Sequence, residues 1–498
     1  MIKTNEWPLI RFIEPIFPEI NVFSKVAQRT TSLGLIMVAT SANKLWGWRV
    51  EVINENNYKG PRNENGLPDH IALQKEKPAT AVGFYCGLSS TIERVWELAE
   101  FYHQQGVFNI AGSWHAHYCP EETLKHNIDI VVHGAGDEII QRILDNLQNK
   151  DQLKDIPGIS FWDKGKIKRN NPERLGVLDL NKLPYPDFGL LRYAKMKTYP
   201  ISRIRGCSMN CEFCSVREKP CWASPEYLFN TVKWLVETRK ARRFFIVDDR
   251  LEENPEGTKR FFQMISEAYN SKLVFSVQIR LETAKNKELL EIMKNAGVRI
   301  ACVGYESPID EDLKAMRKGY SSAKMLEWTK TLKQYIRWIH GMFIIGYPVK
   351  GNSIDSSKIL KHYKRFIRKS CITTIQVLLP VPIPGSDLRK RLENRLLNVP
   401  WRYYDGSYPC FKPNGVSPRE LQDMALKLMK QFYDVWSFFR IPLKTIIFPF
   451  DYLIRGWSGW LHAWLKDIIK YGAYRLVRKW HKKQKNATFF EDLNKSQE

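Results

Sequence analysis

Several features that define whole classes of protein are scarce or missing in this chain of 498 residues. Cysteine occurs nine times, an odd and low number that argues against a disulfide framework and indicates a reducing compartment. No run of about 18 uncharged apolar residues is present, so a membrane-spanning helix is not expected. The first residues, MIKTNEWPLIRFIEPIF, carry early charges and prolines instead of the apolar core of a signal peptide. We therefore expect a cytoplasmic protein.

Acidic residues are outnumbered, with 53 Asp and Glu against 77 Lys and Arg and a formal net charge of +24. This excess favours a polyanionic partner and leaves nucleic acid, anionic lipid and phosphorylated substrates open. The 44% of hydrophobic residues is ordinary for a folded protein, and the length is sufficient for two or three domains.

Apolar runs alternate with helical stretches from Ser32 to about Asn149, as in successive strand-helix units. TAVGFYCG, FNIAGSWH and IDIVVHGAGDE are expected to be strands that run into small or polar residues. A doubly wound, Rossmann-like sheet of this kind holds ligands at the C-terminal ends of its strands. We expect this α/β domain to cover residues 1–150, with ligand loops at 86–89, 112–117 and 134–137.

A second alternation follows residues 151–197, a linker rich in Pro, Gly and Lys in which IPGISFWDKGKIKRN predicts a hairpin. Six strand-helix repeats with polar or glycine residues at the strand ends predict a partial (β/α)6 barrel at 198–385, active at its C-terminal rim. Residues 386–498 are predicted to be a mostly helical extension. Within them, residues 432–485 are rich in both aromatic and basic side chains.

Cys207, Cys211 and Cys214 follow the first expected barrel strand in the stretch RGCSMNCEFCSV. Structural zinc would require a fourth ligand, which Cys221 or a histidine could supply. Three close thiolates without a second cysteine pair suit an iron-sulfur cluster that is one protein ligand short. The iron left open can then bind a substrate or a cofactor directly.

The spacing CxxxCxxC, with Phe213 before the last cysteine, resembles the signature of the radical S-adenosylmethionine (SAM) superfamily. The resemblance implies that the three thiolates hold a 4Fe-4S cluster, that SAM chelates the fourth iron, and that its cleavage yields a 5′-deoxyadenosyl radical. It also implies that the motifs VDD, QIR, GYES and GMFIIGYP surround SAM. The SAM-binding residues expected on this basis are Phe213, Asp248, Asp249, Gln278, Arg280, Glu306 and Gly346.

The stretch NIAGSWHAHYCPEETLKHNIDIVVHGAGDE resembles the cobalamin-binding domain that precedes the radical domain in one subclass of this superfamily. Ser113, Ala135 and Asp137 stand where the subclass often has Gly, Glu and Glu. The motif Asp-x-His-x-x-Gly is missing here, so we expect cobalamin without a protein histidine on cobalt and with Trp114 under the corrin. Predicted cobalamin-binding positions are Leu88, Ser89, Gly112, Ser113, Trp114, His115, Gly134 and Gly136.

These resemblances imply a cobalamin-binding radical SAM enzyme of the class B type that uses an external one-electron donor. The expected reaction is methylation of an unactivated carbon in a small or lipidic metabolite. Residues after 386 resemble the C-terminal extension of the hopanoid-methylase branch. Cyclisation or rearrangement with the same cofactors, RNA modification, and a zinc-stabilised basic binding protein are the alternatives.

The tail at 432–485 has its own alternatives. Trp457, Trp460 and Trp464 recur near helical spacing beside Lys466 and Lys470. This combination suits a helix on an anionic membrane surface, which would place the protein peripherally on the inner face of the membrane. A cap over the substrate pocket explains the aromatic residues equally well. Nucleic acid is the least favoured partner, because no recognition module for it is visible.

Overall fold

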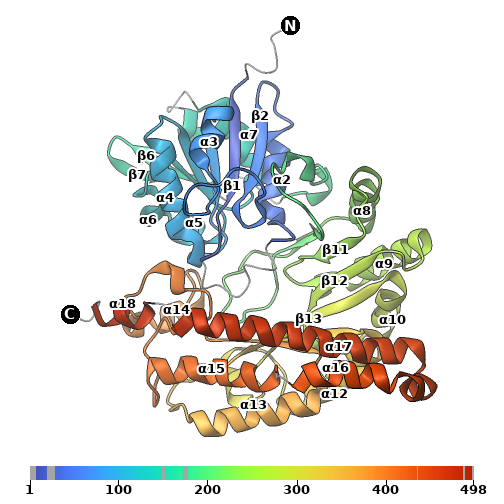
Figure 1. The fold of residues 1–498 in the computed structure, drawn as a ribbon. Coiled ribbons are helices and arrows are strands. Elements are labelled where there is room, and N and C mark those ends of the chain that lie inside the picture. The colour runs from blue at the N-terminus through green and yellow to red at the C-terminus, as the bar shows by residue number, and fades with distance from the viewer. Residues whose placement is uncertain are drawn as a thin grey trace.

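The computed structural model describes residues 7–18, 28–147, 152–171, 178–433, 436–485 and 488–495. Within these ranges the chain forms two large sheets, each flanked by helices, a small two-stranded sheet and a helical C-terminal region (Figure 1). This is the α/β architecture expected from the sequence.

The first sheet has the strand order β2-β1-β3-β4-β5-β6-β7. Its parallel strands are β1 (Leu9–Glu14), β2 (Arg49–Asn54), β3 (Ala81–Tyr85), β4 (Phe108–Gly112) and β5 (Ile130–Val132). Its helices are α2 (Leu33–Ala42), α3 (His70–Glu76), α4 (Ile92–His103), α5 (Trp114–Tyr118), α6 (Pro120–Leu124) and α7 (Gly136–Asp145). Ile10 packs into one core and Ile13 into another, so the sheet is buried on both faces, as a doubly wound sheet must be.

Strand β1 was not anticipated from the sequence, although it lies in the middle of the sheet. Arg11 interrupts the apolar run of this strand, yet its side chain is fully buried. Its Nε lies 2.6 Å from Glu51 Oε1 on β2, and its Nη1 donates to the Tyr102 hydroxyl at 3.0 Å. A satisfied buried ion pair therefore concealed the strand.

The predicted hairpin in the linker is present as β6 (Ile159–Asp163) and β7 (Lys166–Arg169). Strand β6 pairs antiparallel with β5, so this part of residues 151–197 extends the first sheet. Residues 151–197 are therefore a linker only in part, because β6 and β7 belong to the first sheet.

The second sheet is wholly parallel and has the order β15-β14-β13-β12-β11-β8. Its strands are β8 (Tyr199–Ile201), β11 (Arg243–Ile246), β12 (Val274–Ile279), β13 (Val298–Glu306), β14 (Trp338–Ile344) and β15 (Thr374–Leu378). The helices α8 (Pro225–Arg239), α9 (Pro255–Tyr269), α10 (Lys287–Ala296), α11 (Asp310–Ala315), α12 (Ser322–Tyr335) and α13 (Ser356–Ser370) alternate with them. Because β8 and β15 end the order, the sheet is an open arc, as the partial barrel predicts.

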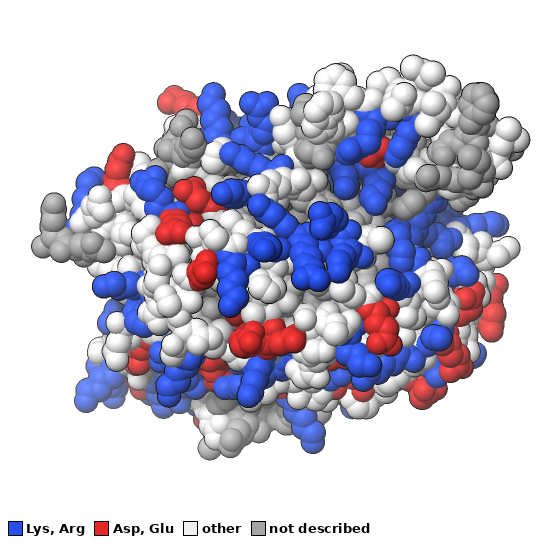
Figure 2. Space-filling view, turned by 90° about the horizontal axis from the view of Figure 1, so that it is seen from below, with Lys and Arg blue, Asp and Glu red and all other residues white. Residues whose placement is uncertain are grey.

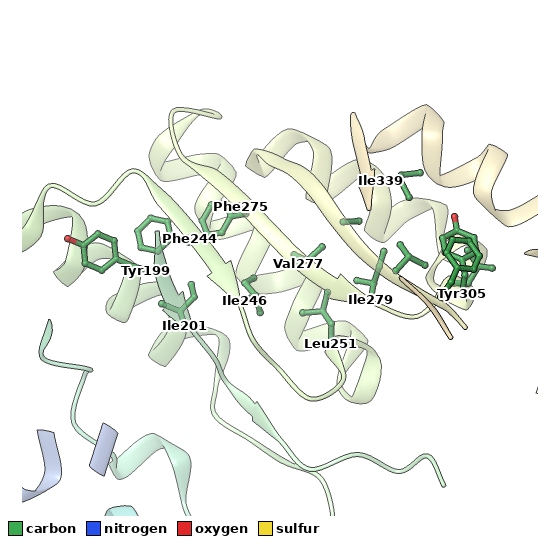
Figure 3. Packing of buried hydrophobic residues seen from close by; sticks show 14 of the residues in the cluster. Tyr199, Ile201, Phe244, Ile246, Leu251, Phe275, Val277, Ile279, Tyr305 and Ile339 are labelled. Atoms are coloured by element: carbon green, nitrogen blue, oxygen red, sulfur yellow. The ribbon is translucent and has the colours of Figure 1, made fainter. Parts of the chain in front are cut away.

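Alternate residues of these strands build the core beneath the helices. Phe275, Val277 and Ile279 of β12 are buried, whereas Gln278 points to the other face and is exposed. Figure 3 shows these apolar side chains with those of the neighbouring strands, among them Phe244 and Ile246. The core side of the arc is therefore fixed, and the polar side chains between the core positions line its inner face.

The C-terminal region contains α14 (Asp387–Arg391), α15 (Pro418–Phe432), α16 (Trp436–Ile446), α17 (Phe448–Lys485) and α18 (Phe489–Lys495). Helix α15 packs on β15 and α13, and α16 lies along α17 (Figure 1). Helix α17 is kinked at Gly456, where φ is 66° and ψ is 171°. Among the helices described, none has the length and apolar character to cross a membrane.

Candidate functional site

The three cysteines lie on one loop, residues 206–220, which we call the cysteine loop. Its ends are held together by two short antiparallel strands, β9 (Ile204–Arg205) and β10 (Cys221–Trp222). Gly206 begins the loop at φ +81°, and a Cβ at this position would lie 2.6 Å from the Glu218 carbonyl oxygen. Only glycine fits such a turn without displacing backbone.

The cysteine thiols are free and receive hydrogen-bond donors. Arg280 Nη1 lies 3.9 Å from Cys211 Sγ, and the Val216 backbone N–H lies 3.4 Å from Cys214 Sγ. Burial raises the pKa of Cys207 and of Cys214, so a bound cation would be needed to keep these sulfurs deprotonated near neutral pH. A set of three thiols with donors aimed at sulfur fits a metal cluster held by three thiolates.

A single zinc ion fits the cysteine loop less well. Among the residues that the structure describes, the side chains close enough to share one ion are His115, Cys119 and Glu122, whose ligand atoms lie within 4.8 Å of one another. The cysteines of the loop do not form such a set with each other or with Cys221.

Asp248 and Asp249 support the backbone that leads into the cysteine loop. Asp248 Oδ1 accepts hydrogen bonds from Ser202 Oγ at 2.7 Å and from the Ile204 backbone N–H at 3.0 Å. Asp249 Oδ2 accepts from the Gly206 backbone N–H at 2.7 Å. Burial raises the pKa of both carboxyl groups. Asp248 Oδ2 is buried without a protein partner and is the one oxygen of Asp248 available to a ligand.

Three other expected SAM residues meet around Lys318, which the sequence analysis did not select. Lys318 Nζ lies 3.0 Å from Glu306 Oε1 and 5.9 Å from the centre of the Phe213 ring. Arg280 donates to the Lys318 carbonyl oxygen at 2.9 Å. Glu306 and Lys318 are both buried, so their ion pair at the rim is shielded from water.

Gln278 and Gly346 stand apart from this group. The exposed Gln278 side chain lies on the inner face of the arc, in register with Cys302 on β13. Gly346 has φ +73°, and a Cβ there would lie 2.2 Å from Leu421 of α15. Gly346 therefore allows α15 to approach the rim, and no contact of its own with the other expected residues is evident.

His340 continues the inner row begun by Gln278 and Cys302, and sequence reasoning missed it. Its Nδ1 lies 2.9 Å from Thr374 Oγ1, and burial lowers the pKa of the ring, so the imidazole is neutral near pH 7. The signal in the sequence was weak, because His340 is the one polar side chain in the strand WIHGMFI.

Glu212 is a second residue that sequence reasoning missed. It lies within the cysteine loop and is buried, with Oε1 2.6 Å from Arg391 Nε. The Tyr347 hydroxyl donates to its Oε2 at 2.5 Å. Because Arg391 is 179 residues away in sequence, no local pattern could indicate this pair.

The C-terminal edge of the first sheet carries the glycines expected to approach cobalamin. Gly134 has φ +81°, and a Cβ there would meet nothing within 4 Å. Gly112 at the end of β4 is similarly uncrowded, with a nearest atom at 3.7 Å. Ser113 has φ 83°, a conformation that costs a non-glycine residue about 1–3 kcal/mol and that often marks a functional site. Open space beside strained backbone fits the approach of a large flat ligand.

His115 is held inside this edge. Its Nδ1 lies 3.0 Å from Ser89 Oγ, and its Nε2 lies 3.7 Å from Glu122 Oε2. Leu88 is exposed, whereas Ser89 is buried. Trp401 packs edge-on to the His115 ring, with centroids 4.8 Å apart, and its indole N–H donates to Glu122 Oε1 at 2.8 Å. These contacts turn the His115 ring inward, toward Ser89 and Glu122.

The remaining expected positions of this edge lie on or beside two helices. Trp114 stacks near Tyr118, with ring centroids 6.3 Å apart and planes 11° from parallel. Gly136 opens α7 and lies close to Val38, which a Cβ would meet at 3.2 Å. A larger residue than glycine would therefore press α7 away from α2.

Two polar contacts join this edge to the cysteine loop. Arg205 Nη1 lies 2.6 Å from Asp137 Oδ2 at the start of α7. The Tyr118 hydroxyl donates to the Ser215 carbonyl oxygen at 2.7 Å. The expected cobalamin edge and the expected cluster loop therefore face each other across one interface, which Figure 1 shows between the blue and green parts of the ribbon.

Residues 201–352 match the family model described as "Radical SAM superfamily". This match covers the second sheet up to β14 together with the cysteine loop. It confirms, for this part of the chain, the resemblance predicted from CxxxCxxC to a class of enzyme whose cofactors are a 4Fe-4S cluster and SAM.

Similar proteins extend the likeness beyond this domain. A methyltransferase of uncharacterised function from Pyrococcus horikoshii is 26% identical over 66% of this chain and 73% of its own length. Bacteriochlorophyllide d C-8(2)-methyltransferase from Chlorobaculum tepidum is 23% identical over 72% of this chain and 79% of its own. Hopanoid C-3 methylase from Methylococcus capsulatus is 22% identical over 72% and 68%, respectively.

A solved structure shares the fold of both sheets. The radical SAM methyltransferase TsrM from Kitasatospora setae, with cobalamin and a 4Fe-4S cluster bound, superposes with a TM-score of 0.65 at 14% identity. The alignment covers 78% of each chain. The likeness confirms the succession of an α/β sheet domain and a radical SAM domain.

Proposed function

We propose that this enzyme is a cobalamin-dependent radical SAM methyltransferase acting on an unactivated carbon of a small or lipidic metabolite. The observation that carries the proposal is the pairing of the two edges through Asp137 and Arg205. A reaction in which two cofactors act on the same substrate carbon requires both cofactors to lie next to one substrate-binding site. The names of the three similar proteins, all methyltransferases or methylases, agree with this reaction.

In this proposal Cys207, Cys211 and Cys214 hold the 4Fe-4S cluster. When bound, the cluster with SAM supplies a 5′-deoxyadenosyl radical, and cobalamin supplies the methyl group. Arg280 donates toward Cys211 Sγ and also to the carbonyl oxygen of Lys318. The electron that starts the reaction comes from an external donor.

The residues of the first sheet are assigned to cobalamin through shape. Gly112, Ser113 and Gly134 offer an open backbone surface, and Trp114 and Tyr118 present stacked rings beside it. His115 is turned inward toward Glu122. This geometry supports cobalamin bound without a protein histidine on cobalt.

The proposal is tested by purifying the enzyme without oxygen and reconstituting it with iron, sulfide and hydroxocobalamin. We expect an iron-sulfur absorption band that disappears in the Cys207→Ala, Cys211→Ala, Cys214→Ala variant, and cobalamin bands that survive desalting in both proteins. With SAM and dithionite, the wild type should release 5′-deoxyadenosine and the variant should not.

Methylation is separated from rearrangement with SAM that carries a deuterated methyl group. Formation of S-adenosylhomocysteine together with labelled methylcobalamin supports methyl transfer before any substrate is known. Retention of cobalamin without S-adenosylhomocysteine would favour a cyclisation or rearrangement. A colourless protein that holds zinc would overturn the radical mechanism altogether.

A further inference from the structure

Helices α16 and α17 expose an unusual number of large apolar side chains around their connection. We call these residues the apolar ridge: Trp436, Phe439, Leu443, Ile446, Leu453 and Trp457. Ile446 is 75% exposed and Leu453 is 80% exposed. Single exposed apolar residues are common on soluble proteins, but a group of this size on two helices packed against each other marks a surface that meets an apolar partner.

The ridge is not a core face turned outward by chance, because the inward side of α16 is polar. Lys444 Nζ lies 2.5 Å from Asp467 Oδ2 and donates to the Ala463 carbonyl oxygen at 3.0 Å. The Trp460 indole N–H donates to the Lys444 carbonyl oxygen at 2.9 Å. These contacts fix α16 on α17 with its apolar residues facing outward.

Positive charge covers α13, which packs on α15, the helix on which α17 also packs. Helix α13 buries Leu360, Tyr363 and Phe366 and contains no Asp or Glu. Its exposed residues include Lys358, Lys361, Lys364, Arg365, Arg368 and Lys369. Figure 2, seen from the side on which α13 lies in Figure 1, shows Lys and Arg spread over the middle of this face.

The positive charge extends between α12 and α17. Burial and the charge of Lys466 lower the pKa of Lys333 to about 8, which shows that cations from the two helices crowd one another. Asp467, an acidic residue of α17, is already paired with Arg440 and Lys444. The exposed cations of α13 have no acidic partner on their own helix.

We infer that the apolar ridge and the basic face of α13 form a docking surface for an anionic phospholipid bilayer. Aliphatic and aromatic side chains of the ridge would enter the headgroup boundary while the cations contact lipid phosphates. A nucleic acid would leave Ile446 and Leu453 exposed to water, and a second copy of the chain would oppose two cationic faces. Charge complementarity therefore favours the lipid surface, and the inference does not depend on the proposed reaction.

The experiment is sedimentation of the full chain with vesicles of phosphatidylcholine alone and of phosphatidylcholine mixed with phosphatidylglycerol. We expect binding to the mixed vesicles, at least tenfold weaker binding to the neutral ones, and a decline with rising salt. Leu443→Ser, Ile446→Ser, Leu453→Ser and, separately, Arg365→Glu, Arg368→Glu should each lower binding to mixed vesicles at least tenfold.

Matched controls carry the same changes on the first domain. Trp46→Ser, Ile71→Ser replaces apolar residues that are 86% and 58% exposed, and Lys75→Glu, Lys77→Glu reverses two exposed cations. Both controls should bind vesicles like the wild type, and thermal melts should show every variant folded. Binding that the ridge and α13 variants leave unchanged would overturn the inference. The inference would also be overturned if the wild type does not bind vesicles and forms a dimer that the ridge variant does not form.

Discussion

Asp137 lies in the first turn of α7, and Arg205 immediately precedes the cysteine loop. The two side chains form an ion pair in which Asp137 Oδ2 and Arg205 Nη1 are 2.6 Å apart. Asp137 is buried, and Arg205 is partly exposed at its tip. The pair therefore fixes the orientation of one domain against the other at the point where their expected cofactors meet.

Removing the charge of Asp137 should loosen this junction. We expect Asp137→Asn to lower the free energy of unfolding by about 1–3 kcal/mol, because the buried Asp137 side chain loses the charge that holds the partly exposed Arg205 guanidinium. The release of S-adenosylhomocysteine should fall while the iron-sulfur absorption is kept. Asp145→Asn, an exposed change on the same helix, is the control. Equal effects of the two variants in urea unfolding would contradict a role for the pair.

Gly134 allows a test of the cobalamin edge that is independent of stability. Gly134→Val should abolish retention of cobalamin after desalting, because the side chain fills the open space beside the backbone. Gly165→Val is the matched control, since Gly165 in the β6–β7 turn also has a left-handed φ and no atom within 4 Å of a Cβ. Both variants carry similar backbone strain, so equal cobalamin content in the two would argue against a ligand at Gly134.

Gly206 should control the shape of the cysteine loop. We expect Gly206→Ala to reduce the iron content after reconstitution and to lower the free energy of unfolding by about 1–3 kcal/mol, through its positive φ and the clash with the Glu218 carbonyl. Gly319→Ala is the control, because Gly319 has φ +77° but open space around it. Iron content equal in the two variants would show that the clash is relieved without cost to the loop.

Asp312 predicts a defined pH dependence of stability. Burial is the main cause that raises its pKa to about 6, and the Ser307 hydroxyl, 2.6 Å from Oδ2, opposes the shift. A carboxyl group whose pKa is raised on folding stabilises the protein when protonated, and this contribution is lost as the pH rises through about 6. Between pH 5 and pH 8 the loss should be about 1–2 kcal/mol.

Urea unfolding at pH 5 and at pH 8 measures this loss. Asp312→Asn should remove it from the difference between the two pH values, whereas the exposed Asp310→Asn should leave the difference unchanged. An Asp312→Asn protein whose stability changes with pH as in the wild type would show that another group dominates.

The sequence was informative wherever function and fold use local patterns. Alternating apolar runs predicted the two sheets, and the hairpin at Ile159–Arg169 followed from its turn residues. Long-range ion pairs were beyond its reach, since neither Arg11 with Glu51 nor Glu212 with Arg391 leaves a periodic signal. A buried charged residue is hard to predict from sequence, whether it lies in a strand or stabilises a loop, because its partner comes from a distant part of the chain.

Site prediction followed the same division. Cysteine spacing and strand ends were visible, and their residues lie at the expected edges of the sheets. The support of the loop by Asp248 was not visible, because hydrogen bonds from a serine hydroxyl and from backbone N–H groups have no sequence pattern. Lys318 likewise follows a helix and reaches the rim only through the tertiary fold.

The order of strands in the second sheet has a consequence for how the enzyme is made. Strands β8 to β15 pair in the order of the chain, so each newly synthesised strand finds its neighbour already present. The cysteine loop is synthesised near the start of this series, whereas Tyr347 and Arg391, which hold Glu212 inside the loop, are synthesised near its end. The loop therefore reaches its final conformation late. For most of the synthesis of this domain, its three thiols lie on a loop that Tyr347 and Arg391 do not yet hold in place.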